Sequence, residues 1–210
     1  ENGKPVRMDS VVVSCKNKEE KDLKKLEAEI RKKVLLPALR PLPPDEETKI
    51  YINPAGRFVC GGLDADTGLT GRKLMVDSYG SMVPHGGGAF SGKDCSKVDR
   101  SAAYMARYIA KNIVAAGLAS KCQVSLAYAI GVAQPVMVQV DTFGTGNVCA
   151  DDCLELAIPL VFGLTPKQIV DSLRLTRPIF RQTAAFGHFG RKEFPWERTD
   201  KVEALRNAVI

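Results

Sequence analysis

Two stretches of the chain repeat apolar residues every three or four positions. Residues 18–36 do so ahead of Pro37 and the proline-rich RPLPP at 40–44, and residues 97–118 do so with many alanines. Because this spacing places apolar side chains on one face of a helix, it predicts helices over both stretches. Proline is expected to end the first helix. Ser96 is the expected N-cap of the second.

Other stretches are rich in β-branched and aromatic residues and are bounded by glycine or proline, a pattern typical of strands. They cover residues 9–14, 48–54, 57–62, 74–80, 122–134 and 135–144. Shorter helices are expected over 151–162, from the Thr165-Pro166 pair, and from about residue 200. Strands and helices alternate without a G-x-G-x-x-G turn after any strand. This favours a layered α+β fold over a dinucleotide-binding fold.

The charge balance favours anionic partners other than nucleic acid. The 210 residues carry a net charge of +6, which attracts anions. However, the densest basic stretch, KEEKDLKKLEAEIRKK at 18–33, alternates in sign as a solvated helix face does. We therefore expect a small anionic ligand and no nucleic-acid partner.

No apolar run approaches the roughly 20 residues needed to cross a bilayer. No basic segment followed by an apolar one opens the chain. We therefore expect no membrane association and a cytoplasmic location. The chain starts with glutamate and enters a predicted strand almost at once, so we expect it to come from the middle of a longer polypeptide.

The stretch HGGGAFSGKDCSKVDR at 85–100 carries the most distinctive chemistry. Three consecutive glycines lose much conformational entropy on folding, so they are costly unless a backbone must approach another group closely. Lys93 and Lys97 lie at the start of a predicted helix, where cations oppose the helix dipole. An anion bound to the free N–H groups would neutralise them. The alternative is that both lysines are solvated.

Two further clusters offer groups that suit a polyphosphate. One is Arg57-Phe58, and the other runs from Asp66 through GLTGRK to Arg72 and Lys73. Arginine can engage two phosphate oxygens at once. Magnesium takes one or two carboxylates together with phosphate oxygens, which Asp99 beside the lysines would satisfy. Read alone, Arg72 and Lys73 are more typical of an exposed basic pair.

The histidines and cysteines give weaker evidence for a functional site than these charged clusters. His85 is either a general base or a hydrogen-bonding loop residue, and His188 is expected to pack among aromatic side chains. The six cysteines lack the close Cys/His pairs of a zinc site. They are expected to be free, partly buried thiols. The sequence shows no Ser/His/Asp or Cys/His arrangement for nucleophilic catalysis.

Four motifs together resemble the S-adenosylmethionine synthetase family. They are INPAGRFVCGG, DTGLTGRK, HGGGAFSGKDCSKVDRSAAY and GHFGR…FPWE…TDK. The resemblance covers nearly the whole chain and corresponds to the later half of the family's sequence. It implies an enzyme, methionine adenosyltransferase, in which the sulfur of methionine attacks the ribose C5′ of ATP. The displaced triphosphate is then hydrolysed to phosphate and diphosphate.

The resemblance also implies roles for individual residues. Lys93, Arg72 and Lys73 would act on the triphosphate as catalytic residues, and Asp99 would be a magnesium ligand. Potassium would be a second ion. The residues implied for ATP and triphosphate are Arg57, Phe58, Asp66, Arg72, Lys73, Ala89 and Lys93. Those implied for methionine are Asp66, Lys97 and Ile130.

The family's fold consists of three repeated α+β domains that interleave along the chain. By resemblance, residues 1–61 belong to the first repeat, 62–101 end the central repeat with the glycine-rich loop, and 102–210 form the C-terminal repeat. The N-terminal part of the fold would be missing. A homo-oligomer with active sites at a dimer interface is implied. The alternative function is an inactive fragment or a non-catalytic regulatory subunit that binds a catalytic partner.

Overall fold

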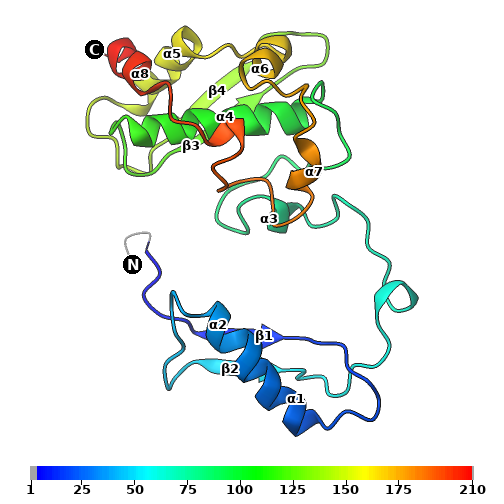
Figure 1. The fold of residues 1–210 in the computed structure, drawn as a ribbon. Coiled ribbons are helices and arrows are strands. Elements are labelled where there is room, and N and C mark those ends of the chain that lie inside the picture. Colours follow the sequence, from blue (N-terminus) through cyan, green and yellow to red (C-terminus); the bar gives the residue numbers. More distant parts are fainter. Residues whose placement is uncertain (1–3, 210) are drawn as a thin grey trace. The chain divides into compact units, whose positions relative to one another are not determined.

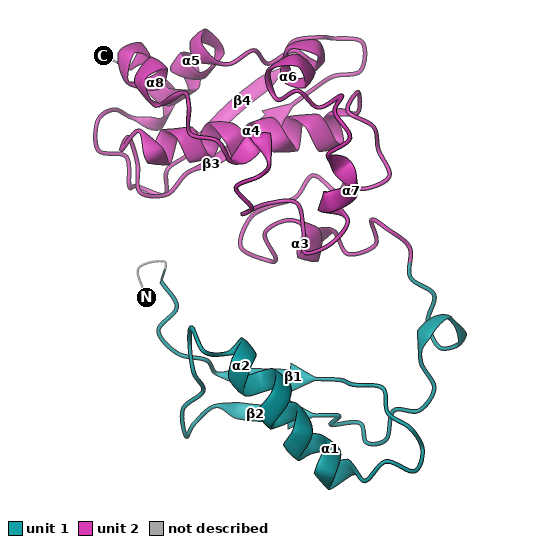
Figure 2. Cartoon of the chain, in the orientation of Figure 1, with its two compact units in different colours: residues 1–68 teal, residues 69–210 magenta. Residues whose placement is uncertain are grey.

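The computed structural model describes residues 4–209 and divides them into two compact units. The boundary lies between Gly68 and Leu69, and Figure 2 colours the two units separately. Each unit has its own helices and strands. The three-part division at residues 61 and 101 remains a prediction.

The first unit is a two-stranded parallel sheet with one helical segment. β1 (Ser10–Val13) pairs with β2 (Lys49–Ile52) so that Val11 lies opposite Ile50. The helical segment between them is α1 (Leu23–Ile30), a π-helical turn (Arg31–Leu35) and α2 (Leu36–Ala38). Figure 1 shows this segment lying across the two strands.

Two expectations for the first unit are corrected. The helix begins at Leu23 rather than at residue 18, because Asp22 caps it by accepting from the N–H groups of Lys24 and Lys25. The stretch 57–62 is not a strand, since it bends at Cys60 and Gly62 begins a 3₁₀ turn. Phe58 exchanges hydrogen bonds only with Asn17, through its own carbonyl and N–H, so no regular ladder forms.

The second unit is built around one long helix and an antiparallel strand pair. α4 (Val98–Ala115) packs against β3 (Gln123–Ala127), which pairs with β4 (Met137–Asp141). The remaining elements are α3 (Leu74–Asp77), α5 (Asp151–Val161), α6 (Pro166–Ser172), α7 (Phe180–Thr183), a 3₁₀ turn (Pro195–Glu197) and α8 (Val202–Ala208). Figure 1 shows α5, α6 and α8 along the same side of this unit.

The core of the second unit lies around α4. Tyr104, Ile109 and Ile113 of this helix are fully buried, together with Ile158 of α5 and Trp196. The buried residues of α4 recur at helical spacing, so the apolar stripe read from the sequence is the buried face of this helix. Thr165 caps α6 with a complete capping box to Gln168, as its sequence predicts.

Two expectations for the second unit are wrong. Residues 74–77 form α3 instead of a strand, because the N–H of Asp77 bonds to the carbonyl of Lys73 and no strand pairs with them. Ser96 does not cap α4. Lys97 holds the N-cap position without a side-chain bond, while Asp94 accepts hydrogen bonds from the N–H and hydroxyl of Ser96.

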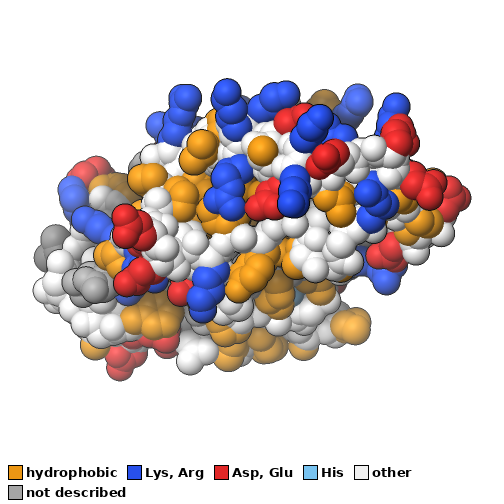
Figure 3. Space-filling view, turned by 90° about the horizontal axis from the view of Figure 1, so that it is seen from below, with side chains coloured by type: hydrophobic (Ala, Val, Ile, Leu, Met, Phe, Trp, Pro, Cys, Tyr) orange, Lys and Arg blue, Asp and Glu red, His pale blue; other side chains and the backbone are white. Residues whose placement is uncertain are grey.

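The α+β class is confirmed. Within residues 4–209, no single helix is long and apolar enough to cross a membrane. The helices 151–161 and 166–173 reach that length and hydropathy only jointly, with a bend of 75° between them. Figure 3 shows one face of the molecule, on which basic and acidic side chains are interspersed.

Candidate functional site

The glycine-rich loop lies directly against the first turn of α4. A Cβ atom on Gly88 would come within 2.3 Å of the Asp99 carboxyl carbon, so a side chain at this position would displace Asp99 or the loop. Gly87 and Gly92 have φ of +89°, which favours glycine for a second reason. The loop therefore needs its glycines both for backbone conformation and for close approach to a carboxylate.

Lys93, Ala89 and Asp99 form a compact polar group at this loop. The Lys93 ammonium donates to the carbonyl oxygen of Ala89 at 2.8 Å and lies 3.4 Å from Asp99 Oδ2. Both charged side chains remain partly exposed, at 30% for Lys93 and 49% for Asp99. A cation and a carboxylate are thus side by side and open to a ligand.

Lys97 turns away from this group. Its ammonium lies 2.6 Å from Asp94 Oδ2, whereas Lys93 contacts Ala89 and Asp99. The hydrogen bonds from Lys97 and Ser96 hold the pKa of Asp94 well below its usual range. The structure therefore separates two lysines that the sequence presents together.

Arg72 and Lys73 follow a glycine that lies against the loop. A Cβ on Gly71 would come within 2.8 Å of the Ala89 Cβ and 3.8 Å of the Ser91 carbonyl oxygen, so Gly71 lies beside residues 89–91. Lys73 holds the N-cap position of α3. The backbone thus brings the basic pair and the Lys93 group to the same part of the second unit.

Arg57, Phe58 and Asp66 belong to the first unit. The Arg57 guanidinium donates to the carbonyls of Lys18, Glu19 and Lys21, which fixes the loop ahead of α1. The Phe58 side chain is 38% exposed, which leaves it accessible for contact with a flat ligand. Asp66 follows a 3₁₀ turn (Gly62–Asp64) and is exposed.

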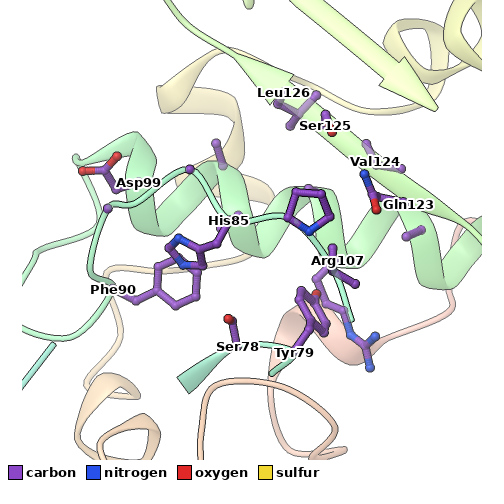
Figure 4. Close-up of a pocket in the computed structure, with 18 of the residues that line it drawn as sticks. Ser78, Tyr79, His85, Phe90, Asp99, Arg107, Gln123, Val124, Ser125 and Leu126 are labelled. Atoms are coloured by element: carbon purple, nitrogen blue, oxygen red, sulfur yellow. The ribbon is translucent and has the colours of Figure 1, made fainter. Parts of the chain in front are cut away.

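An open cavity of about 650 Å³ extends from the glycine loop along α4. Figure 4 shows Asp99 at one end and Arg107 at the other, with His85 and Phe90 between them. Cys122 and residues 123–126 of β3 contribute to the opposite wall. Ile130, in the loop between β3 and β4, is fully exposed and does not line this cavity.

Sequence reasoning missed the far end of the cavity. Arg107 is held there by two hydrogen bonds of 3.0 Å to the buried carboxylate of Glu197, which also accepts from Lys111. Tyr79 lies beside it, and burial raises the pKa of its phenol to about 12. The available signal was helical spacing, since Arg107 is two turns beyond Asp99 on α4.

Neither histidine is arranged as a free general base. Nδ1 of His85 accepts from the N–H of Gly87 at 2.8 Å, a bond that shapes the loop. His188 is completely buried and contacts the ring of Phe90, as its aromatic context predicted. Burial, followed by the charges of Arg100 and Arg191, lowers the pKa of His188 to about 4.

Within residues 4–209, no three His, Cys, Asp or Glu side chains gather as a metal site. Asp99 offers a carboxylate next to Gly88 and Lys93, while the nearby Asp94 pairs with Lys97. This donor set fits Mg²⁺ that receives most of its ligands from phosphate oxygens and water. All six cysteines are free, as expected.

Comparisons with known proteins match both parts of the chain to one family. The family model for the S-adenosylmethionine synthetase C-terminal domain matches residues 60–198, and that for the central domain matches residues 1–58. Among solved structures, the chain is similar to an S-adenosylmethionine synthetase from Campylobacter jejuni that is described as unusual. The identity is 43% and the TM-score 0.90, over 100% of this chain and 55% of that chain.

The chain therefore spans about half the length of that relative. The matched family models cover both units, and the structural match includes the glycine loop and α4. By sequence and by fold, the chain belongs to the S-adenosylmethionine synthetase family.

Proposed function

We propose that the protein containing this chain is a methionine adenosyltransferase that forms S-adenosylmethionine from ATP and L-methionine. The sulfur of methionine attacks the ribose C5′ while the bond from C5′ to the triphosphate oxygen breaks. The triphosphate leaves with the bonding electrons and is then hydrolysed to phosphate and diphosphate. The observation that carries this proposal is the Lys93–Asp99 pair beneath the glycine loop.

The leaving triphosphate gains negative charge in the transition state. A fixed cation near that charge lowers the barrier, because its stabilising interaction is stronger in the transition state than in bound ATP. Lys93 is fixed in this way by the Ala89 carbonyl and by Asp99. Arg72 and Lys73 follow Gly71, which lies beside the same loop, and would bind the remaining phosphate oxygens.

The remaining roles follow from the family resemblance. Phe58 would stack on adenine, Arg57 would contact the nucleotide, and Asp66 would contact both substrates. Lys97 and Ile130 would contact methionine, either in the same site or in that of another subunit. The full exposure of Ile130 is compatible with a homo-oligomer whose active sites lie at a dimer interface.

Asp99 would hold Mg²⁺ together with the phosphate oxygens, and the ion would neutralise charge on the triphosphate. Potassium is proposed as a second ion, without an assigned ligand among these residues. The six free thiols are typical of a reducing compartment, which supports a cytoplasmic location.

The test is S-adenosylmethionine formation by the complete protein from ATP, methionine, Mg²⁺ and K⁺, followed by mass spectrometry. The Lys93→Ala variant should lose about 100-fold or more in kcat, the scale of removing one fixed electrostatic donor. Lys167→Ala is the matched control, because Lys167 is an exposed lysine of α6 paired only with Asp171. Its kcat should be unchanged.

Two results would count against the proposal. Near-normal turnover of Lys93→Ala would remove Lys93 from the reaction. A complete protein that forms no product would contradict the transferase activity and favour a non-catalytic subunit.

A further inference from the structure

Arg100 is a buried cation near the start of α4 that is stabilised by neutral groups. Its residue is 3% exposed, yet no ion pair within residues 4–209 includes it. It donates to Tyr104 Oη at 3.0 Å, to the Lys93 carbonyl at 2.6 Å and to Thr183 Oγ1 at 2.9 Å. The Phe180 ring centre lies 3.6 Å from its guanidinium carbon. Burying a charge costs free energy unless hydrogen bonds or an ion pair compensate for the lost water, and here neutral groups supply the hydrogen bonds.

The hydrogen bonds around Arg100 can be arranged as one directed chain. An arginine can only donate, so Tyr104 Oη accepts from it and keeps its own proton for a second partner. His188 Nδ1 lies 2.7 Å from that hydroxyl, and His188 Nε2 lies 3.1 Å from Ser91 Oγ. Directing the Tyr104 proton to Nδ1 makes Nδ1 an acceptor and leaves Nε2–H to donate to Ser91 Oγ, so that the chain runs from Arg100 through Tyr104 and His188 to Ser91.

This chain ends on the loop that carries Lys93. Ser91 is held through His188, and the carbonyl of Lys93 is held directly by Arg100. Gly92 lies between these two anchors with φ of +89°. Three consecutive residues are thus fixed from inside the core, and the Lys93 ammonium reaches Ala89 and Asp99 from that base.

We propose that Arg100, Tyr104 and His188 are positioning residues for Lys93, with His188 acting as the neutral Nε2–H tautomer. The inference rests on the proposed transferase function. None of the three touches the substrates. They fix the loop so that the Lys93 ammonium need not reorganise as charge develops on the triphosphate.

The surroundings of His188 favour its neutral form. Arg100 of α4 and Arg191 of the following loop both oppose a positive imidazole, and both lie close to it. From α3, the Asp77 backbone carbonyl accepts the His188 N–H at 3.1 Å. A second proton on the ring would also face the Tyr104 oxygen that already accepts from Arg100.

The first test is Ser91→Ala in the complete protein, since Ser91 is half-buried and its loss removes only the end of the chain. We expect kcat to fall about three- to tenfold, the range for one net hydrogen bond, with the KM for ATP nearly unchanged. Ser172→Ala, which removes one part-buried hydroxyl hydrogen bond on α6, is the matched control. An unchanged kcat in Ser91→Ala would overturn the proposal.

A second test separates positioning from packing. In His188→Gln the amide N–H replaces the Nε2–H donor to Ser91, whereas in His188→Asn the amide oxygen replaces only the Nδ1 acceptor. We expect His188→Gln to keep most of kcat and His188→Asn to match Ser91→Ala. Equal kcat losses in the two variants would contradict a positioning role.

The tautomer can be read directly. Two-bond ¹H–¹⁵N correlations on protein labelled at histidine should show His188 as the neutral Nε2–H form at pH 7, with His188→Gln assigning the signal. An Nδ1–H form or an imidazolium at this pH would overturn the proposal. This readout does not depend on product formation, so it distinguishes failure of the network from failure of the transferase function.

Discussion

A side chain at position 88 would occupy the space that the Asp99 carboxylate fills. The Cβ of alanine would lie 2.3 Å from the carboxyl carbon, so Asp99 or the loop must move. We predict that Gly88→Ala lowers kcat at least tenfold and raises the Mg²⁺ concentration needed for half-maximal rate, because it displaces the proposed ligand. Both values come from S-adenosylmethionine formation at varied Mg²⁺.

Gly86→Ala is the control for this experiment. Position 86 has no atom within 4 Å of an added Cβ, and its φ is outside the left-handed region. The variant changes the same motif by the same atom without a clash. If both variants lose activity equally, the loss reflects the flexibility of the loop and not contact with Asp99.

At the residue scale, the sequence located the chemistry but not its partners. The glycine loop and the two lysines were predicted together from local pattern. It was not predicted that the two lysines have different partners: Lys97 pairs with Asp94, three residues away, while Lys93 contacts Ala89 and Asp99. Contacts such as His188 with Tyr104, 84 residues apart, depend on the fold and have no local signal.

At the element scale, the segment that carries His188 and Trp196 is predicted to make the second unit sensitive to acid. The indole N–H of Trp196 donates to the His188 carbonyl. In the unfolded chain His188 titrates near its usual value of 6.5, whereas its folded pKa is about 4. The unfolded state therefore binds the proton first as pH falls, and stability decreases with it.

The free energy of unfolding should fall by about 2 kcal/mol between pH 7 and pH 5, from 1.36 kcal/mol for each unit of pKa difference. Urea unfolding followed by Trp196 fluorescence measures it, because Trp196 is the chain's one tryptophan and is fully buried. His188→Asn cannot take up the proton and should flatten the dependence. The same slope in both proteins would exclude His188 as its cause.

Between pH 7 and pH 5, the change in the free energy of unfolding reports on His188 and not on the buried carboxylate of Glu197. Burial alone would raise the pKa of Glu197, but hydrogen bonds from Arg107, Lys111 and the Gly190 N–H outweigh it and lower the pKa. A lowered carboxylate pKa weakens the fold only below its usual value of 4.5. Measurements down to pH 5 therefore leave Glu197 charged.

Elements with a strong periodicity of apolar residues or a clear cap were predicted well, and short elements were not. α4 has an apolar stripe at helical spacing, and α6 has a capping box; both features lie within the helix's own sequence. Residues 74–77 contain only four positions, which fit a strand or a helical turn equally, and the absence of a pairing strand decides for the turn. The stretch 57–62 has strand composition but bonds to an irregular loop.

At the scale of the whole molecule, the two units differ in how much apolar surface they bury. Ile30 and Leu35 are the buried hydrophobic residues described in the first unit, and the remaining core residues belong to the second. Two strands alone are marginally stable, and parallel pairs are normally covered on both faces. Val12 and Tyr51, which pair across β1 and β2, are instead exposed.

We predict that amides of β1 and β2 exchange with solvent deuterium at least 100-fold faster than those of α4 and β3. Local stability sets the exchange rate, and the first unit has little to oppose opening. Hydrogen exchange with peptide mass spectrometry on the 210-residue chain measures the difference. Equal protection of the two units would contradict it.

The directed hydrogen bonds around Arg100 also constrain how relatives diverge. In the proposed chain Tyr104 Oη accepts from Arg100 and donates to His188 Nδ1, and His188 Nε2–H donates to Ser91, so a single change leaves a buried partner unpaired at a cost of about 1–3 kcal/mol. Lysine cannot replace Arg100, since one ammonium cannot reach three separate acceptors. Positions 91, 100, 104 and 188 are therefore expected to be inherited as one unit, retained together or exchanged together across the family.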